Sequence, residues 1–322
     1  MTMMKKRLLK RLVLYTFPPI PNSYSFTPFG LKTESFLRIN KIQYEKCYTT
    51  SFGKNGTIPY LRIFDGDQDV KSDHFEEISD SNQIIACLLK DTDFDTSQCE
   101  ENMTKEQKAI AHSCLRMLEE HTTPTGFYYR YFLHMPTYCE ATQMRERAFM
   151  GDTSRFGNFI FKMVSKGMIK AWEKKAKVRG FLRYSKPDVV WAMACEDLQA
   201  LEDLLASNQD QKLFFGRSNP GVLDCTVFGH LSQFLYIAMD FPQKTYLKEN
   251  CPCLLRFMEH FKESYFPDWD ILCERQPNEG LDPENPRMQA LKTKMKRKAL
   301  RVVAVMVAVG AVGYHTLGSP FS

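Results

Sequence analysis

Two short segments in the first third of the chain can together bind an anionic, extended peptide. Thr57-Ile58-Pro59 places a proline after an aliphatic residue, and a cis bond at Pro59 would turn the backbone N–H and C=O of Ile58 toward a ligand. Asp80-Ser81 precedes an apolar helical run. Ser81 and the helix N-terminus can hold a carboxylate, and Asp80 can face an ammonium group. Each segment alone is common, and Asp-Ser before a helix is also an ordinary N-cap.

Both segments lie in a stretch that alternates strands and helices. Pro28 is suited to the first turn of a helix, and Asp65-Gly66-Asp67 predicts a hairpin turn. β-branched and aromatic side chains predict the strands, and apolar residues at helical spacing predict the helices. We expect strands at 12–17, 44–48, 58–64 and near Val70, with helices from Pro28 and over 79–89. This order, β-α-β and then β-β-α, indicates a thioredoxin-like domain.

The rest of the chain is helical in pattern. Thr104 and Gln107 form a capping box after a polar, acidic linker. Helices are expected around 156–176, 187–206, 225–239 and 251–265. We therefore predict an α+β protein with a thioredoxin-like domain at 11–91 and an all-helical domain at 103–270. A Pro- and Gly-containing linker at 271–291 and a basic, then apolar, C-terminal segment at 292–322 follow.

The order of these motifs resembles the glutathione S-transferase (GST) superfamily. The matching segments are 27–38, 56–60, 80–85 and 226–231, and together the resemblance spans residues 12 to about 269. Within that superfamily the sequence is most similar to the failed-axon-connections proteins, their nematode cadmium-responsive relatives and, more distantly, the metaxins. The resemblance implies a GST N-terminal domain, a helical GST C-terminal domain and glutathione as ligand at Ile58, Pro59, Asp80 and Ser81.

The segment 27–38 departs from the families in this superfamily that use a reactive thiol. Those families place cysteine near the start of this helix, and here the two candidate positions hold Thr27 and Gly30. A transferase would have to activate the glutathione thiol with a hydroxyl that stabilises the thiolate. Thr27 is the candidate catalytic residue, and Tyr15, Thr16 and Ser25 are alternatives.

Two functions follow from the resemblance. A GST-like interaction or adaptor module is favoured, because the fold and groove remain while the thiol is lost. Glutathione transfer to electrophiles in detoxification or stress response is the alternative, so an enzymatic role is left open. A peroxide- or metal-handling role that uses the many thiols is a third and weaker possibility.

The helical region carries a further match to the superfamily. Residues 214–224 resemble the loop and acidic start of the buried core helix in glutathione transferases, with Gly221 in place of the usual Ser or Thr. Asp224 then keeps only one half of a capping box. His230 follows among apolar residues and is expected to be a core histidine.

The cysteine spacing and the charge distribution argue against a metal site and against nucleic-acid binding. Ten cysteines are scattered through apolar stretches, as in a reducing compartment, and Cys251-Pro252-Cys253 matches no zinc-site spacing, so no metal and no tightly bound cofactor are expected. The formal charge is +5, but basic clusters near the two ends supply it and leave the body net acidic. We therefore expect no nucleic-acid binding.

The C-terminal segment predicts a membrane anchor. Residues 302–313 carry no charge and 314–317 can extend this run, directly after a basic flank at 292–301. Such a flank is typical of a cytosol-facing anchor, although the run is shorter than a usual span. We expect anchoring through 302–317, with the mitochondrial outer membrane favoured and the endoplasmic reticulum as an alternative. A buried terminal strand or helix is the other interpretation.

Overall fold

Four short strands form a mixed sheet in a computed structural model that describes residues 10–64, 74–99, 103–148, 155–208 and 212–274. The order across the sheet is β2-β1-β3-β4. Strand β1 (Arg11–Thr16) pairs in parallel with β2 (Glu45–Tyr48) and antiparallel with β3 (Tyr60–Phe64). Strand β4 (Glu76–Ser79) pairs antiparallel with β3. The fourth strand was expected near Val70, which lies outside the described residues.

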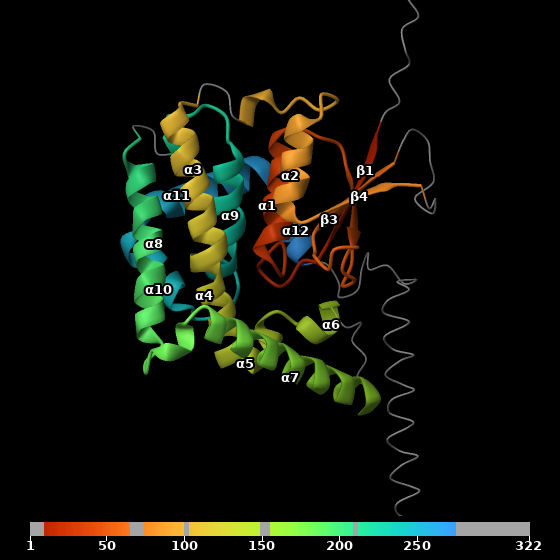
Figure 1. The fold of residues 1–322 in the computed structure, drawn as a ribbon, viewed down its shortest axis with the longest axis vertical. Helices are drawn as coiled ribbons and strands as arrows, with labels where there is room; N and C mark the ends of the chain where they lie inside the picture. Colours follow the sequence, from red (N-terminus) through yellow and green to blue (C-terminus); the bar gives the residue numbers. More distant parts are fainter. Residues whose placement is uncertain (1–9, 65–73, 100–102, 149–154, 209–211, 275–322) are drawn as a thin grey trace, which may run out of the picture. The chain divides into compact units, whose positions relative to one another are not determined.

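Two helices cover one face of this sheet (Figure 1). Helix α1 (Pro28–Ile39) starts with the expected proline, and α2 (Ser81–Lys90) follows β4 directly. Alternate side chains of β1 and β3 point toward the helices and join the main apolar core. The side chains between them form a separate cluster on the other face, which contains Val13, Tyr15, Ile58, Tyr60 and Phe64.

Helices make up the remainder of the described chain. In order they are η1 (Ser97–Cys99), α3 (Lys105–Met117), η2 (Leu118–Thr122), α4 (Thr123–Phe127), η3 (Tyr128–Leu133), α5 (Met135–Ala141), α6 (Met144–Ala148), α7 (Arg155–Val178), η4 (Phe181–Arg183), α8 (Asp188–Ala206), η5 (Phe214–Gly216), α9 (Val222–Leu235), α10 (Pro242–Asn250), α11 (Pro252–Tyr265) and α12 (Trp269–Cys273). The α+β class, with a thioredoxin-like region followed by a helical one, is confirmed. None of the described helices is both long and apolar enough to cross a membrane.

The first long helix of this region widens into two π-helical turns. Thr104 caps its start, and Gln107 closes the expected capping box. The helical backbone then continues without a break from α3 through η2 and α4 to η3. Pro124 lies between the two wide turns, and a proline can donate no hydrogen bond to the preceding turn. The sequence pattern did not predict this widening.

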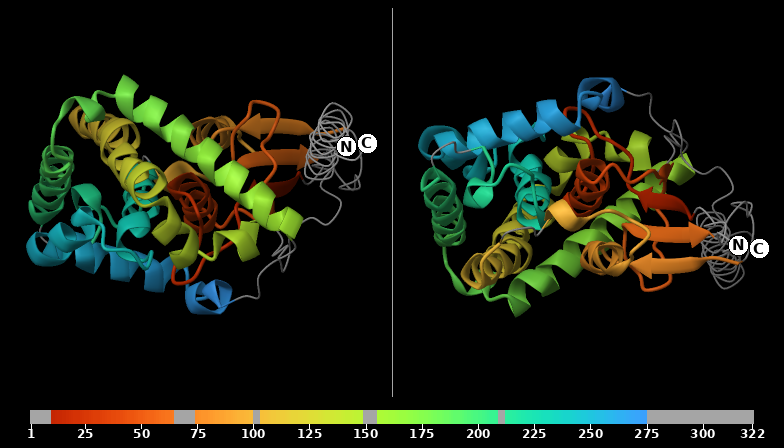
Figure 2. Two further views of the ribbon diagram at one scale, coloured as in Figure 1. Left: turned by 90° about the horizontal axis from the view of Figure 1, so that it is seen from below. Right: turned by 90° about the horizontal axis from the view of Figure 1, so that it is seen from above.

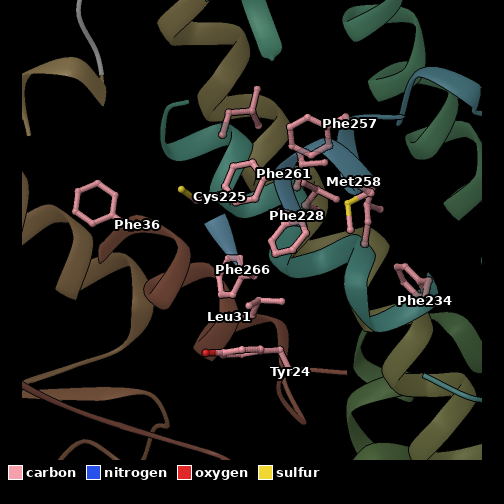
Figure 3. Packing of buried hydrophobic residues seen from close by; sticks show 14 of the residues in the cluster. Tyr24, Leu31, Phe36, Cys225, Phe228, Phe234, Phe257, Met258, Phe261 and Phe266 are labelled. Atoms are coloured by element: carbon pink, nitrogen blue, oxygen red, sulfur yellow. The ribbon is translucent and has the colours of Figure 1, made fainter. Parts of the chain in front are cut away.

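The two regions share one core because α1 packs directly on the buried helix α9. Gly229 makes this close approach possible, since a Cβ atom there would lie 2.8 Å from the carbonyl oxygen of Pro28 and 2.9 Å from the amide nitrogen of Lys32. Aromatic side chains then fill the space beside the two helices, with Phe228 stacked on Phe261 at 4.6 Å between ring centroids. Figure 3 shows Leu31 of α1 among these rings.

Candidate functional site

The proline loop and the start of α2 meet at the end of the β3–β4 ladder. The Ile58–Pro59 peptide bond is cis, as expected from the sequence. The backbone N–H of Asp80 donates to the carbonyl oxygen of Pro59 at 3.3 Å, one step beyond the Tyr60–Ser79 pair of the ladder. The structure therefore brings together the two segments that we predicted would form one ligand groove.

Asp80 caps helix α2. Its Oδ1 accepts from the backbone N–H groups of Asn82 at 2.8 Å and Gln83 at 3.3 Å. The residue has φ 80° and ψ 134°, a conformation that costs a non-glycine residue about 1–3 kcal/mol and is found most often at binding sites. Oδ1 of Asp80 therefore acts as an ordinary helix N-cap.

Buried hydroxyl groups flank the contact between Pro59 and Asp80. The hydroxyl oxygens of Thr57, Ser79 and Ser81 are all buried and have no hydrogen-bond partner in the described part of the chain. Ser81 itself is 1% exposed at the first position of α2. Buried polar groups in proteins are almost always hydrogen-bonded. Unpaired hydroxyls at a helix start therefore indicate a ligand that supplies the missing hydrogen-bond partners.

Thr27 stands at the N-cap of α1 but does not cap it. Its side chain makes no bond to the helix, and its buried Oγ1 has no partner among the residues described. The backbone N–H of Thr27 donates to Oγ of Ser25 at 3.3 Å, so Ser25 serves the turn. Tyr15 is engaged elsewhere, since its ring stacks on Tyr60 and its hydroxyl accepts from Arg62 at 3.4 Å.

Thr16 and Gly30 are in direct contact. A Cβ atom added at Gly30 would lie far inside the van der Waals radius of Thr16 Oγ1. Thr16 is 3% exposed, and its Oγ1 has no hydrogen-bond partner within the described ranges. The Thr16 hydroxyl therefore occupies the space that a cysteine side chain would need at this position.

A buried arginine fixes the loop before Thr27. Arg130 is 1% exposed, and its guanidinium donates to Oε1 of Gln233 at 2.9 Å and to the carbonyl oxygen of Phe26 at 3.3 Å. Gln233 in turn donates to the carbonyl oxygen of Ser25 at 3.1 Å. Two helices of the helical region thus hold two successive carbonyl groups of the loop and set the position of the α1 start.

A buried ion pair supports the start of α2 from behind. Lys32 is fully buried, and its Nζ lies 2.7 Å from Oε1 of Glu119 and 2.6 Å from Oδ1 of Asn82. Asn82 also donates to Oε2 of Glu119 at 2.7 Å. Burial lowers the pKa of Lys32, and the carboxylate of Glu119 opposes that shift. Lys32, Asn82 and Glu119 thus link α1, α2 and η2. Asn82 directly follows Ser81, so this link fixes the start of α2.

A second network surrounds Glu34, which is 1% exposed. Its Oε1 accepts from the hydroxyl of Tyr44 at 2.7 Å and pairs with Nζ of Lys46 at 2.5 Å. Arg38, one turn later on α1, binds both carboxylate oxygens of Asp268 at 2.6 and 2.8 Å. This network joins α1, β2 and the turn before α12, and therefore fixes the side of α1 away from α2.

The start of helix α9 has the capping contacts of Asp224 that the sequence predicts. Asp224 accepts from the backbone N–H groups of Gly221 at 2.7 Å and Phe214 at 3.0 Å, the half of the capping box that glycine allows. Burial raises the pKa of Asp224 to about 6, against the effect of these two donors. His230 is fully buried with Nδ1 2.5 Å from Oγ1 of Thr123, and burial lowers its pKa well below the usual range. His230 is therefore a buried core histidine, as the sequence predicts.

Thiol chemistry finds little support in the described residues. Burial raises the pKa of every cysteine for which a shift is resolved, to about 11 for Cys139 and about 12 for Cys251 and Cys273. A raised pKa keeps a thiol protonated and poorly nucleophilic. In the ranges that the structure describes, no group of His, Cys, Asp and Glu side chains could hold a metal ion.

The residues that position the site were not found from the sequence. Lys32 and Glu34 fall on the sides of α1 away from its apolar stripe, which predicts exposure, yet both are buried. The partners of Lys32 lie far along the chain, with Glu119 87 residues away, whereas Glu34 binds Tyr44 only 10 residues away. A charged residue inside a helix next to a candidate motif was the only available signal.

Comparison with known proteins agrees with this architecture. A family model for the glutathione S-transferase N-terminal domain matches residues 28–137, and one for the glutathione S-transferase C-terminal domain matches residues 194–261. The protein Failed axon connections from Drosophila melanogaster is 28% identical over 270 residues, or 82% of this chain. The match covers 60% of the length of that relative.

Among the solved structures that comparison matches to this chain are two glutathione transferases. One from Phanerochaete chrysosporium has a TM-score of 0.47 at 15% identity and covers 79% of this chain and 96% of its own. Another from that organism, in complex with oxidized glutathione, has a TM-score of 0.45 at 15% identity, with coverages of 82% and 96%. From the two domain matches and the relative, the chain belongs to the glutathione S-transferase-like superfamily, in the group of Failed axon connections.

Proposed function

We propose that this protein binds glutathione, or a peptide of the same shape and charge, and acts as an interaction module and not as an efficient transferase. The observation that carries the proposal is the contact between Thr16 and Gly30. It removes the thiol position, whereas the proline loop and the start of α2 still lie side by side through the bond from Asp80 to Pro59.

The binding half of the proposal rests on the unpaired hydroxyls and the helix start. A γ-glutamyl carboxylate can accept from the hydroxyl and the backbone N–H of Ser81, since Asp80 already accepts from the next two N–H groups of α2. The backbone of Ile58 can pair with the middle of the ligand. Thr57 offers a further donor beside the proline. Asp80 uses Oδ1 for its cap, so an ammonium group would approach its other oxygen.

Glutathione transfer is the second candidate, and one observation favours it. The Thr27 hydroxyl is buried at the start of α1 and makes no hydrogen bond to any described residue. A hydroxyl in this position can donate to a glutathione thiolate and lower the pKa of the thiol.

Titration calorimetry of glutathione into the full chain, with turnover of a chloronitrobenzene electrophile measured in parallel, tests both candidates. We expect binding without appreciable turnover. Ser81→Ala should weaken binding by about 1–3 kcal/mol, the cost of leaving a charged partner unpaired. Ser113→Ala is the control, because that hydroxyl is exposed on α3 and bonds only to the carbonyl oxygen of Ala109. Absence of binding would refute the module as proposed, and rapid turnover would favour the transferase.

Membrane anchoring belongs to the same proposal. The uncharged run at 302–317, next to its basic flank, supports a tether that holds the module at a membrane facing the cytosol, with the mitochondrial outer membrane favoured. A protein partner on that surface would then be the binding target of the module.

A further inference from the structure

Helix α7 presents a row of lysines on its outer side. Lys162, Lys166, Lys170 and Lys174 follow one another at four-residue spacing, so they lie along one side of the helix. All four are exposed, and none of them forms an ion pair with a described residue. Between residues 157 and 178 the helix carries six lysines and a single acid, Glu173. This concentration of charge contrasts with the net acidic body of the protein.

Apolar side chains lie on the same outer side. At 100° per residue, Phe159 and Met163 point in nearly the same direction as Lys166 and Lys170. Phe159 is 55% exposed and Met163 is 39% exposed, both large values for side chains of this type. The outer side of α7 therefore combines exposed apolar groups with a surrounding row of positive charge.

The opposite side of α7 packs against the apolar core. Phe161, Met168 and Trp172 pack against the main apolar cluster, and Ala176 is buried beside Phe181. The ring of Trp172 stacks on Tyr131 at 5.2 Å between centroids. Figure 2 shows α7 running across the outside of the helical region, so its outer side has no neighbouring element among the described residues. The exposure of Phe159 and Met163 thus serves no packing within the described fold.

We propose that the outer side of α7 is a docking surface for an anionic lipid membrane. A basic helix with exposed aromatic and aliphatic groups binds the membrane–water interface, where apolar side chains enter the acyl boundary and lysines meet lipid phosphates. The long lysine side chains can reach the headgroups while Phe159 and Met163 insert between them. A purely electrostatic partner such as a nucleic acid would use the lysines but would leave these two side chains in water. The inference goes beyond the proposed function and does not rest on residues 302–317.

The test is sedimentation of the chain without residues 292–322, so that the proposed tether and its basic flank do not contribute, with vesicles of phosphatidylcholine alone and with 30% phosphatidylserine. Every contact described above lies within residues 10–274, and an unchanged helical circular dichroism spectrum checks that the shortened chain is folded. Replacing Lys162, Lys166, Lys170 and Lys174 with Gln should weaken binding to the anionic vesicles by at least about tenfold, since each lysine near such a surface contributes about fivefold. The control changes four exposed lysines on other elements by the same total charge: Lys41, Lys90, Lys105 and Lys248 to Gln. This control should lose less than about threefold.

A second variant tests insertion separately from charge. Phe159→Gln with Met163→Gln should bind anionic vesicles in low salt and lose binding at 0.5 M salt, where the electrostatic attraction is screened. Ile271→Gln, which removes an apolar side chain that is 71% exposed on α12, should behave as the wild type. Equal losses in the two lysine variants would overturn the proposal. Binding of heparin or DNA through α7 without any preference for anionic vesicles would also overturn it.

Discussion

The hydroxyl of Thr16 fills the space that a side chain at position 30 would need. A Cβ atom on Gly30 would also lie 3.2 Å from Oγ of Ser25, so the position is enclosed from two directions. Thr16 ends a central strand and Gly30 lies in the first turn of α1, so neither backbone can shift without disturbing the sheet or the helix. The local packing therefore excludes a cysteine side chain at position 30. A functional cysteine there would require a second substitution at Thr16.

Gly30→Ala should destabilise the wild-type protein much more than a Thr16→Ala variant. Overpacking in a closed site costs about 1–3 kcal/mol, which outweighs the gain of about 1 kcal/mol that alanine brings to a helix over glycine. In the Thr16→Ala background the severe contact is gone, and only the closer approach to Oγ of Ser25 at 3.2 Å offsets the propensity gain, so the loss should be small. Urea unfolding followed by circular dichroism measures both values. The same loss in both backgrounds would show that Thr16 does not restrict position 30.

Lys32→Met should lower the free energy of unfolding by about 3–5 kcal/mol. The reason is that Glu119, which is 8% exposed, would lose its buried cation and keep only the more exposed Arg116, whose guanidinium lies 3.6 Å from Oε2. Lys32→Met combined with Glu119→Leu should recover a large part of this loss, because two apolar side chains can replace a buried ion pair of similar volume. The four proteins of this cycle are compared by urea unfolding. Losses that simply add would mean that the two charges do not depend on each other.

The pair of Arg38 and Asp268 should make stability depend on acid pH. Burial raises the pKa of Asp268, but the hydrogen bond and charge of Arg38 outweigh it, so the pKa lies below its ordinary value. The folded state then binds fewer protons than the unfolded state in this window. The stabilisation is complete above about pH 4, the pKa in the unfolded chain, and is lost as pH falls through the depressed folded pKa.

Asp268→Asn is the variant that measures this contribution. Its free energy of unfolding should be about 1–2 kcal/mol below the wild-type value at pH 7, and the two values should converge below pH 4. Urea unfolding at several pH values provides the comparison. A difference that stays constant down to pH 2 would show that the effect does not arise from the charge of Asp268.

Local signals predicted many elements of this fold, but not the short helices α5, α6, α10 and α12. Thr104 and Gln107 marked a helix start, and Pro28 marked another, because capping and proline placement depend on neighbouring residues only. The cis bond before Pro59 was expected from its segment and its place before a strand. These features need no knowledge of distant contacts.

The residues that position the candidate site were beyond such signals. Lys32 is a charged residue in an expected amphipathic helix, and Arg130 lies between the helices that the sequence predicts. Both are buried, and their partners lie 50 to 104 residues away. The conflict between Thr16 and Gly30 depends on how close β1 and α1 come to each other. Sequence spacing contains no measure of that distance.

Thr27→Ala distinguishes the two proposed functions. In a transferase it should reduce turnover by about 10- to 1,000-fold with a much smaller effect on glutathione affinity, because it removes a donor to the thiolate. In a module it should leave binding nearly unchanged. Any single cysteine replacement, such as Cys47→Ser or Cys87→Ser, should preserve both properties, and loss of all activity in one of these variants would contradict the assignment.

Removing residues 292–322 should release a folded protein from membranes. Insertion of the run at 302–317 should be marginal, because valine and alanine gain little and glycines and His315 offset part of the gain. The basic flank adds about 1 kcal/mol per Lys or Arg near anionic lipid. The full chain should therefore stay in the pellet after a carbonate wash, and the shortened chain should not.

The shortened chain also separates the tether from α7. If both proposals hold, it should still bind anionic vesicles in a salt-sensitive manner, because the lysines of α7 remain and their attraction is electrostatic. Replacing Lys162, Lys166, Lys170 and Lys174 with Gln in the shortened chain should then remove the remaining binding. A shortened protein that still pellets after the carbonate wash, or that has lost its helical circular dichroism, would show that 302–317 is not an independent anchor.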